Sequence, residues 1–412
     1  MRYGPQRVLS VSLQLEKEDT MLKLKRILPI VIITFFMVVS LTLAPSAEAG
    51  KLSGDSVKIG GIYSVSGVCA EWGTAAKISA EIAVEEINAA GGIGGVPIEM
   101  VWYDVGCKAP PAIPVVEKLA KQDKVLVVNG PCQSSVCEVI FPKLNRIKMP
   151  MVSFCSSKPG LSALSPWAFR NTLTSDKQLD PAITKWKEKY GIKSAVILYN
   201  SEDAVSTVEG KKIMPVLFKK HGIELKKMFT FQTQTVDFAP FVTEIKALNP
   251  DAIAVGSCYE AGAKIAIEAK KQGLKTPMLG GACNSTPGLI EIGGEAVEGY
   301  YGSTAAWIDG NPDPRMVKYL EKFKARSPGG KAPPYGGPRS YDNIYIIKKI
   351  MEEEGVTNKS GDLAKDRDKI RAGWEKLKNF DGISGVTTMD KNGDGVGGVR
   401  TLVVESGKFM AQ

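Results

Sequence analysis

The chain has 412 residues, with 53 Lys and Arg against 44 Asp and Glu and a formal net charge of +9. This length exceeds what one hydrophobic core normally organises, so two lobes are expected. The lysines are scattered along predicted helix faces, a pattern typical of a solvated surface that argues against nucleic-acid binding.

The segment 21–49 has the pattern of an export leader. Three basic residues precede an apolar run over 27–43, and small residues end the segment at Ala49. Cleavage near Ala49 would release a periplasmic or secreted chain with a net charge of +7. Residues 1–20 are polar and unpatterned, which indicates a mis-assigned start with Met21 as the initiator. A retained anchor is the alternative, since the apolar run is marginal against the ~20 residues of a spanning helix.

After the leader, strand-like and helix-like segments alternate, and the alternation restarts after Thr172. Strict alternation predicts parallel sheets with right-handed crossovers. The predicted class is α/β, with two doubly wound parallel-sheet lobes. The expected strands are 57–63, 98–104, 125–129, 151–155, 195–199, 228–231, 252–256, 277–280 and a hairpin over 399–410; the expected helices are 75–89, 111–121, 135–144, 206–220, 238–248, 261–271, 314–325 and 341–354.

Metal binding and catalysis have little support in the sequence. Seven cysteines in an exported chain permit disulfides and leave at least one thiol unpaired, but zinc-type spacing is absent and His221 is the only histidine. No Ser-His or Cys-His pair, HExxH or P-loop is present. We therefore expect no metal, no cofactor and no enzymatic activity.

Two glycine-rich or acidic motifs near the C-terminus are rejected. Residues 393–398 match GxGxxG, but a strand follows where a dinucleotide site requires a helix. Asp390, Asn392 and Asp394 match the first positions of a calcium-binding loop. The twelfth position, however, is Thr401 in place of a glutamate. A polar turn is the better interpretation.

The loops at predicted strand ends are more informative. Ligands of an open parallel sheet bind beyond the carboxyl ends of its strands, and these positions hold the segments 66–72, 130–135 and 153–157. The last two are rich in hydroxyl groups and run into helix starts or turns with free N–H groups. Such ends can hold a carboxylate without a buried cation. Ordinary helix caps would explain Ser134 or Ser157 singly.

The chain resembles the periplasmic binding proteins of the branched-chain amino acid (Leu/Ile/Val) type, which serve ABC importers. The resemblance covers residues 56–412, and it is carried by the order and spacing of several short motifs. It implies two lobes joined by three crossings, a ligand in the cleft, hinge closure, and a monomeric periplasmic receptor that docks on a membrane permease. The motifs are Ile59–Gly67 with Trp72-Gly73, Glu85–Ile93, Tyr103-Asp104, Gly273–Thr276, and Phe380-Asp381-Gly382 followed by Gly385 and Asp390–Asp394.

Lobe boundaries and site residues follow from the resemblance. It implies an N-terminal lobe of 50–175 plus 306–376 and a C-terminal lobe of 176–305 plus 377–412. It also implies a disulfide near Cys107 and Cys132. Ser134, Cys155 and Ser157 fall at the carboxylate and amino anchors, with Cys155 contributing backbone groups, and Trp72 falls where an aromatic ring covers the ligand. The expected ligand-binding residues are Trp72, Ser134, Cys155, Ser156, Ser157, Asp203, Tyr259, Ala282, Tyr335 and Arg339.

The sequence departs from the family at the ammonium site. Ala282 replaces the acidic residue, and an unpaired buried ammonium would cost several kcal/mol. Asp203, Glu202 and Glu260 are the possible replacements, which keeps amino acids possible. Otherwise the ligand is an organic or aromatic acid or a small amide, held against Trp72 and Tyr335 with Arg339 as counter-ion. A solvated Pro/Gly loop around Tyr335 and Arg339 is the alternative, and a ligand sensor on the same fold is the alternative to import.

Overall fold

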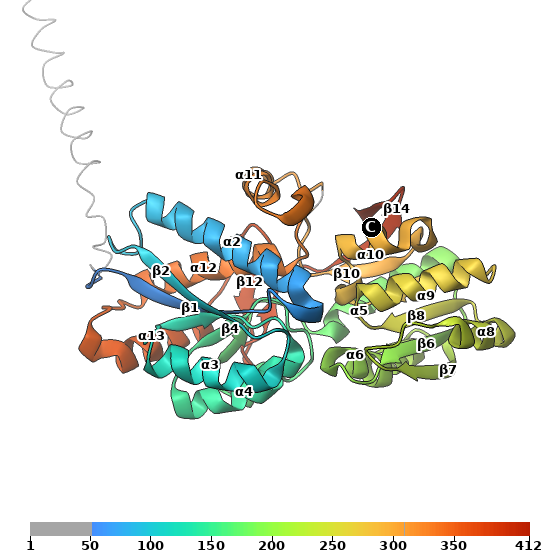
Figure 1. The fold of residues 1–412 in the computed structure, drawn as a ribbon, viewed down its shortest axis with the longest axis horizontal. Coiled ribbons are helices and arrows are strands. Elements are labelled where there is room, and N and C mark those ends of the chain that lie inside the picture. The colour runs from blue at the N-terminus through green and yellow to red at the C-terminus, as the bar shows by residue number, and fades with distance from the viewer. Residues whose placement is uncertain (1–51, 309) are drawn as a thin grey trace, which may run out of the picture. The chain divides into compact units, whose positions relative to one another are not determined.

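The computed structural model describes residues 52–308 and 310–412, and it shows an α/β protein of two lobes (Figure 1). The predicted leader 21–49 and the predicted mis-assigned start lie outside these residues. Within the described part of the chain, no helix is both long and apolar enough to cross a membrane.

The N-terminal lobe is built on a five-stranded parallel sheet. Its strand order is β2-β1-β3-β4-β5, so the connections from β1 run to both sides of that strand. This reversal of direction leaves a crevice at the carboxyl ends of β1 and β3, where open sheets bind ligands. The strands are β1 (Val57–Tyr63), β2 (Ile98–Asp104), β3 (Val127–Asn129), β4 (Met151–Ser153) and β5 (Ala168–Arg170).

Helices cover both faces of this sheet because each carries an apolar stripe (Figure 1). One face is covered by α2 (Ala70–Ala89) and α12 (Gly336–Glu353), with α11 (Pro314–Lys324) and α13 (Leu363–Lys376) in the same core. The other face is covered by α3 (Ala109–Lys121) and α4 (Ser134–Ile147). Both faces of the inner strands are therefore buried, and β2 at the edge is partly exposed.

The C-terminal lobe repeats this plan with an added hairpin. The strand order is β15-β14-β10-β9-β8-β6-β7. The connections from β6 therefore also run to both sides of that strand, and the switch point lies between β6 and β8. The predicted hairpin is confirmed, because β14 and β15 pair antiparallel. The strands are β6 (Ser194–Asn200), β7 (Glu224–Phe231), β8 (Ala252–Gly256), β9 (Met278–Gly280), β10 (Tyr301–Thr304), β14 (Arg400–Glu405) and β15 (Lys408–Ala411).

The helices of this lobe form two layers around the sheet. The core on one face contains α5 (Ser175–Tyr190) and α7 (Met214–Lys220). The core on the opposite face contains α8 (Ala239–Leu248), α9 (Tyr259–Lys271) and α10 (Pro287–Gly293). Short 3-10 turns include Gly67–Cys69 and Ala282–Asn284.

The predicted helix 206–220 is interrupted. It begins as α6 (Ala204–Val208), widens into a π-helical turn over Glu209–Ile213, and continues as α7. Gly210 lets this turn pack closely against β6. A Cβ at this position would lie only 2.3 Å from the Cβ of Tyr199. A π-turn adds one residue per turn, and such turns are frequent at functional sites.

A small antiparallel sheet completes the chain before β14. It consists of β11 (Phe380–Gly382), β12 (Gly385–Met389) and β13 (Gly395–Val396). Ile383 and Met389 lie in the core that contains α2 and α12, so this sheet belongs with the N-terminal lobe. The chain enters the C-terminal sheet only at β14, later than the expected boundary at 377.

Three segments connect the lobes, and two buried arginines hold them. Arg170 donates from Nε to Asp394 at 2.5 Å, which joins the first segment to the third. Arg339 donates from Nη1 to Asn171 and Thr387, at 3.0 Å each, and from Nη2 to the carbonyl of Ala305. The guanidinium of Arg339 thus contacts the first and second connections and the strand that leads to the third.

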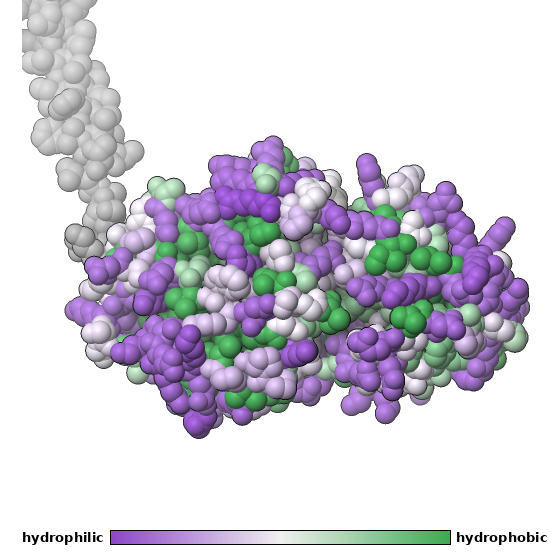
Figure 2. Space-filling view, viewed as in Figure 1, coloured by the Kyte–Doolittle hydropathy of each residue, from purple (hydrophilic) through white to green (hydrophobic). Residues whose placement is uncertain are grey.

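Hydrophilic residues are spread over much of the face in Figure 2, with apolar patches between them.

Candidate functional site

The candidate site lies where strand ends of the two lobes meet. Trp72 of α2 packs edge-on against Tyr335, with ring centroids 5.1 Å apart, and both side chains are buried. The Tyr335 hydroxyl donates to the carbonyl of Cys155 at 2.9 Å. Ala282, which follows β9 in the other lobe, lies in the same apolar cluster. The structure therefore brings these four predicted residues together across the lobes.

The predicted serines line the N-terminal wall of this site. Ser134 begins α4, and its Oγ accepts from the backbone N–H of Lys158 at 3.3 Å. The Oγ and carbonyl of Ser157 both accept from Ser175, at 2.8 to 3.1 Å. Ser156 is buried, and its Oγ has no partner within the described structure. Its N–H donates to Ser153.

Several other buried polar atoms near the cleft have no protein partner. Buried polar groups normally form hydrogen bonds, so a cluster of unpartnered atoms indicates where a ligand or water binds. The aromatic member is Trp72 Nε1, and the rest come from the N-terminal wall, the first connecting segment and the C-terminal lobe. Among the described residues they are Ser156 Oγ, Thr172 Oγ1, Thr174 Oγ1, Gln178 Oε1, Ser285 Oγ and Ser303 Oγ.

Glu209 is the acidic residue of this region that the sequence analysis did not single out. It lies in the π-turn, is 4 % exposed, and forms no ion pair with a described lysine or arginine. Burial raises the pKa of its carboxyl to about 7, while a hydrogen bond with Ser175 lowers it and the charge of Asp203 raises it. The carboxylate faces Gly281, where a Cβ would lie 2.5 Å from Oε2. Ser175 thus links Glu209 to Ser157 of the opposite lobe.

The three acids proposed from sequence occupy other environments. Asp203 caps α6 by accepting from the N–H and Oγ of Ser206, at 2.9 and 2.7 Å. Glu202 is exposed and accepts from the N–H of Thr233. Glu260 is exposed on α9. Their geometry favours Glu209 over all three as the acid of a buried site.

Tyr259 and Glu71 approach each other from opposite lobes. Burial and the charge of Glu71 raise the pKa of Tyr259. Glu71 lies in the first turn of α2 and is close to Gly288 at the start of α10. Burial, followed by the charge of Glu291, raises the pKa of Glu71 to about 7. Both side chains therefore belong to the contact between the lobes.

The alternative of a solvated loop around Tyr335 and Arg339 is wrong. α12 begins at Gly336, five residues before the predicted start, so Tyr335 lies at its N-terminus and Arg339 in its first turn. Both side chains are 2 % exposed. Burial lowers the pKa of Arg339, and two of its nitrogens already bind the connecting segments. This arrangement favours a hinge role over that of a ligand counter-ion.

The expected disulfide between Cys107 and Cys132 is also wrong. Cys107 is bonded to Cys69, and Cys132 is bonded to Cys155. The first bridge joins the loops after β1 and β2, and the second joins the loops after β3 and β4. Each pairing connects neighbouring strand ends, which the tertiary fold brings within 5.7 and 4.9 Å between Cα atoms.

The acidic segment near the C-terminus forms a turn. Asp390 accepts from the N–H groups of Asn392 and Asp394, at 2.8 and 3.0 Å, and Asp394 is paired with Arg170. Across residues 52–308 and 310–412, no cluster of three potential metal ligands is found. His221 contacts Asp180 at 2.7 Å on the surface of the C-terminal lobe.

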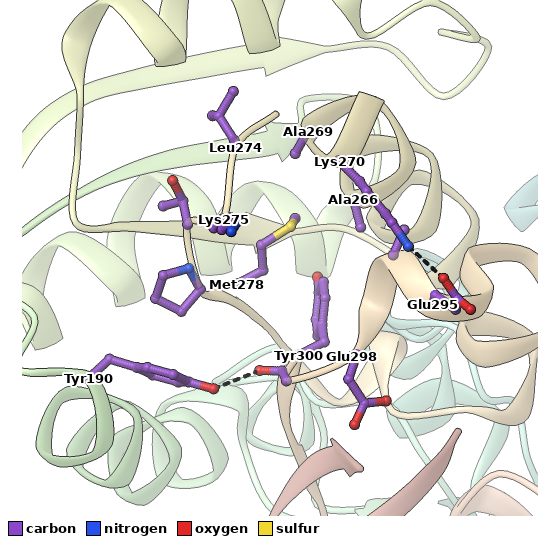
Figure 3. Close-up of a pocket in the computed structure, with 14 residues that line it drawn as sticks. Tyr190, Ala266, Ala269, Lys270, Leu274, Lys275, Met278, Glu295, Glu298 and Tyr300 are labelled. Carbon is purple, nitrogen blue, oxygen red and sulfur yellow. Dashed lines mark hydrogen bonds and ion pairs between the residues drawn. The ribbon is translucent and has the colours of Figure 1, made fainter. Parts of the chain in front are cut away.

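A pocket of about 250 Å³ lies elsewhere, in the C-terminal lobe (Figure 3). It is lined by Tyr190, Met278 and Tyr300, and Lys270 is paired with Glu295 at its edge. Met278 begins β9, so this pocket lies at the amino end of the sheet. Ligands of doubly wound sheets bind at the opposite, carboxyl edge, so we do not assign this pocket as the principal site.

Two doubly wound lobes with polar groups at facing strand ends define a two-lobed solute-binding protein. A model of the family described as "Periplasmic binding protein" matches residues 56–408. The chain therefore belongs to the periplasmic binding protein family, and it is a binding protein and not an enzyme.

Curated and solved relatives agree with this assignment. A leucine-, isoleucine-, valine-, threonine- and alanine-binding protein of Pseudomonas aeruginosa is 23% identical over 311 residues, which are 74% of this chain and 80% of the relative. A leucine-binding protein LivK from Thermotoga maritima superposes with a TM-score of 0.77 at 26% identity, covering 86% of this chain and 97% of the other. A solute-binding protein from R. palustris in complex with 4-hydroxybenzoate gives a TM-score of 0.76 at 21% identity, covering 87% and 96%.

Proposed function

We propose that this chain is the extracytoplasmic receptor of an ABC importer and that it captures a small α-amino carboxylate between its lobes. The observation that carries the ligand class is Glu209, a buried carboxylate without a cationic partner among the described residues. A buried carboxylate is costly unless it is paired, and a ligand ammonium would supply the pair. Amino-acid-binding relatives support this choice.

The opposite end of the ligand would lie on the N-terminal wall. The hydroxyl groups of Ser134 and Ser157 and the free N–H groups at the start of α4 can donate to a carboxylate. The Ser175 hydroxyl lies within hydrogen-bonding reach of both Ser157 and Glu209, so the two ends are separated by about one serine hydroxyl. This short separation suits a ligand whose ammonium and carboxylate groups are attached to the same carbon atom.

Trp72 and Tyr335 would cover the remaining part of the ligand. Their rings form one apolar wall, and Ala282 contributes a small side chain to the same cluster. Closure of the lobes would remove water from the charged contacts and strengthen them. The closed form would then be the one that docks on a permease.

An aromatic acid is the second candidate ligand. The Trp72–Tyr335 pair and the apolar Ala282 favour it, and one structural relative was solved with 4-hydroxybenzoate. Such a ligand has no cation for Glu209, so it would require Glu209 to be protonated. A sensor role on the same fold would use either ligand without a transporter.

Ligand identification is the test. Native mass spectrometry would identify what co-purifies, and calorimetry would compare leucine, valine and alanine with benzoate and 4-hydroxybenzoate. Binding of amino acids with release of a proton from Glu209 supports the proposal. Tight binding of benzoates alone would refute the amino carboxylate, and turnover of a bound ligand would refute a receptor. Size-exclusion chromatography and uptake by cells with the permease test the monomer and importer proposals.

A further inference from the structure

Two of the three free cysteines in the described chain lie side by side at the edge of the candidate site. The free thiols are Cys137, Cys258 and Cys283. Cys258 follows β8 and precedes α9, and Cys283 follows β9 within a 3-10 turn. Both are at the carboxyl edge of the C-terminal sheet, where the ligand is expected.

The register of the strands places these two cysteines at equivalent positions. β8 and β9 are neighbouring parallel strands in which Val255 pairs with Gly280. Each cysteine is three residues beyond its member of that pair. Neighbouring strands lie about 4.8 Å apart, which is within the Cα separation that a disulfide can span.

The loops that carry the thiols are fixed to each other. Asn284, next to Cys283, donates from Nδ2 to the carbonyl of Ser257, next to Cys258, at 2.6 Å. Asn284 is fully buried, and its Oδ1 accepts from the Tyr300 hydroxyl at 3.3 Å. The two cysteines are therefore held together by a bond between their immediate neighbours.

The Cys258 thiol is also close enough to affect the protonation of Cys283. A hydrogen bond with Cys258 raises the pKa of Cys283, and burial and the charges of Cys258 and Glu209 add to this. Cys258 is exposed, whereas Cys283 is half-buried. An oxidant in solution would thus reach Cys258 first and Cys283 second.

We propose that Cys258 and Cys283 form a reversible disulfide at the wall of the ligand cleft. With an oxidised low-molecular-weight disulfide such as oxidised glutathione, the Cys258 sulfur attacks one sulfur and releases one glutathione thiol. Cys283 then attacks the mixed disulfide at Cys258 and releases the second. Two protein thiols and one oxidised glutathione become one protein disulfide and two reduced glutathiones, so atoms and electrons balance.

The remaining thiol provides an internal reference. Cys137 is fully buried in α4, and burial raises its pKa to about 12. It lies in the core of the other lobe, away from Cys258 and Cys283. It should stay reduced under conditions that oxidise the pair.

Oxidation would also affect the ligand, and this part of the inference rests on the proposed function. Cys283 follows Ala282 of the apolar cluster, and its thiol lies near Glu209. A disulfide would restrain the loop that carries both Ala282 and Cys283. The affinity of the oxidised protein should therefore differ from that of the reduced protein.

The full chain can be equilibrated with oxidised or reduced glutathione, alkylated in denaturant and mapped by peptide mass spectrometry. We expect one alkylated thiol, Cys137, after oxidation and three after mild reduction, with the bridges of Cys69 and Cys132 intact in both. A glutathione adduct that stays on Cys258, or free Cys258 and Cys283 after oxidation, would overturn the disulfide.

Calorimetry of the two redox forms tests the effect on the ligand. With the ligand identified by co-purification, we expect a Kd change of about threefold or more between the forms. The change should be absent in Cys258→Ser, which cannot form the bridge. Equal Kd values for two forms with a mapped disulfide would overturn only the effect of the disulfide on ligand affinity. Failure to bind any amino acid would overturn the proposed ligand and leave the disulfide proposal intact.

Discussion

Glu209→Gln provides the sharpest test of the proposed site. The substitution keeps the shape of the side chain and one acceptor oxygen and removes its charge. Without that charge a bound ammonium would be buried unpaired, so we expect amino acid affinity at pH 8 to fall by about 3 kcal/mol, roughly 100-fold. Isothermal calorimetry would measure this loss.

The unliganded variant should be more stable than the wild type. Burial raises the pKa of Glu209 from 4.5 to about 7, so above pH 7 the folded protein carries a charge that it disfavours. A shift of this size corresponds to about 3 kcal/mol of destabilisation, which Gln removes. Chemical denaturation at pH 8 should show the gain, and at pH 4 the two proteins should converge because Glu209 is then protonated in both states.

Binding should depend on pH in a direction that identifies the ligand class. An ammonium binds ionised Glu209, and the ionised fraction falls as pH drops through about 7. Amino acid affinity should therefore be about 30-fold weaker at pH 5.5 than at pH 8. A benzoate would show the opposite trend, because its charge favours protonated Glu209.

Matched substitutions separate a site effect from general electrostatics. Glu202→Gln removes an exposed carboxylate on the same lobe, and it should change neither affinity nor its pH dependence. Unchanged amino acid affinity in Glu209→Gln, or a pH dependence that survives the substitution, would refute the assignment of Glu209.

Four further outcomes follow from the structure. Ser157→Ala should weaken binding by about 1–3 kcal/mol with little loss of stability, and unchanged affinity in calorimetry would place the carboxylate elsewhere. Trp72→Ala should cost about 2 kcal/mol of affinity in the same assay through lost apolar cover, and a smaller loss for larger ligands would contradict that role. Arg339→Lys should lower the unfolding free energy by about 2 kcal/mol in urea, since one ammonium cannot reach all three of the partners Asn171, Ala305 and Thr387. Glu71→Gln should favour closure above pH 7, where the buried carboxylate opposes it, and X-ray scattering of the unliganded protein would detect the change.

The strands and their order along the chain were predictable because strands and helices alternate in both lobes. Parallel strands buried on both faces read as continuous apolar runs, and β1 and β8 have the predicted bounds. The strand-end loops were predictable for the same reason, since the end of an apolar run marks the carboxyl edge of the sheet. Ser134 and Ser157 were found in this way.

Other features depend on geometry that a one-dimensional pattern does not contain. The π-turn that carries Glu209 packs closely against β6, where Gly210 leaves room for Tyr199, a residue of a different element. Glu209 and Gly210 follow the first strand of the C-terminal lobe in the sequence, but helical periodicity alone predicted an uninterrupted helix over 206–220. The start of α12 was predicted late because of Pro338, although proline is tolerated in the first turn of a helix.

The sequence by itself determined the class of the protein, because alternating apolar runs and helical faces admit few arrangements other than two doubly wound lobes. Only the tertiary structure decided which cysteines pair, which acid is buried and what Arg339 holds. Cys69 meets Cys107, and Cys132 meets Cys155, because adjacent strands end side by side whatever their separation along the chain. Burial of Glu209 likewise depends on Gly281, which follows β9 and lies against its carboxylate, and the pKa of such a group is set by neighbours that only the fold brings close.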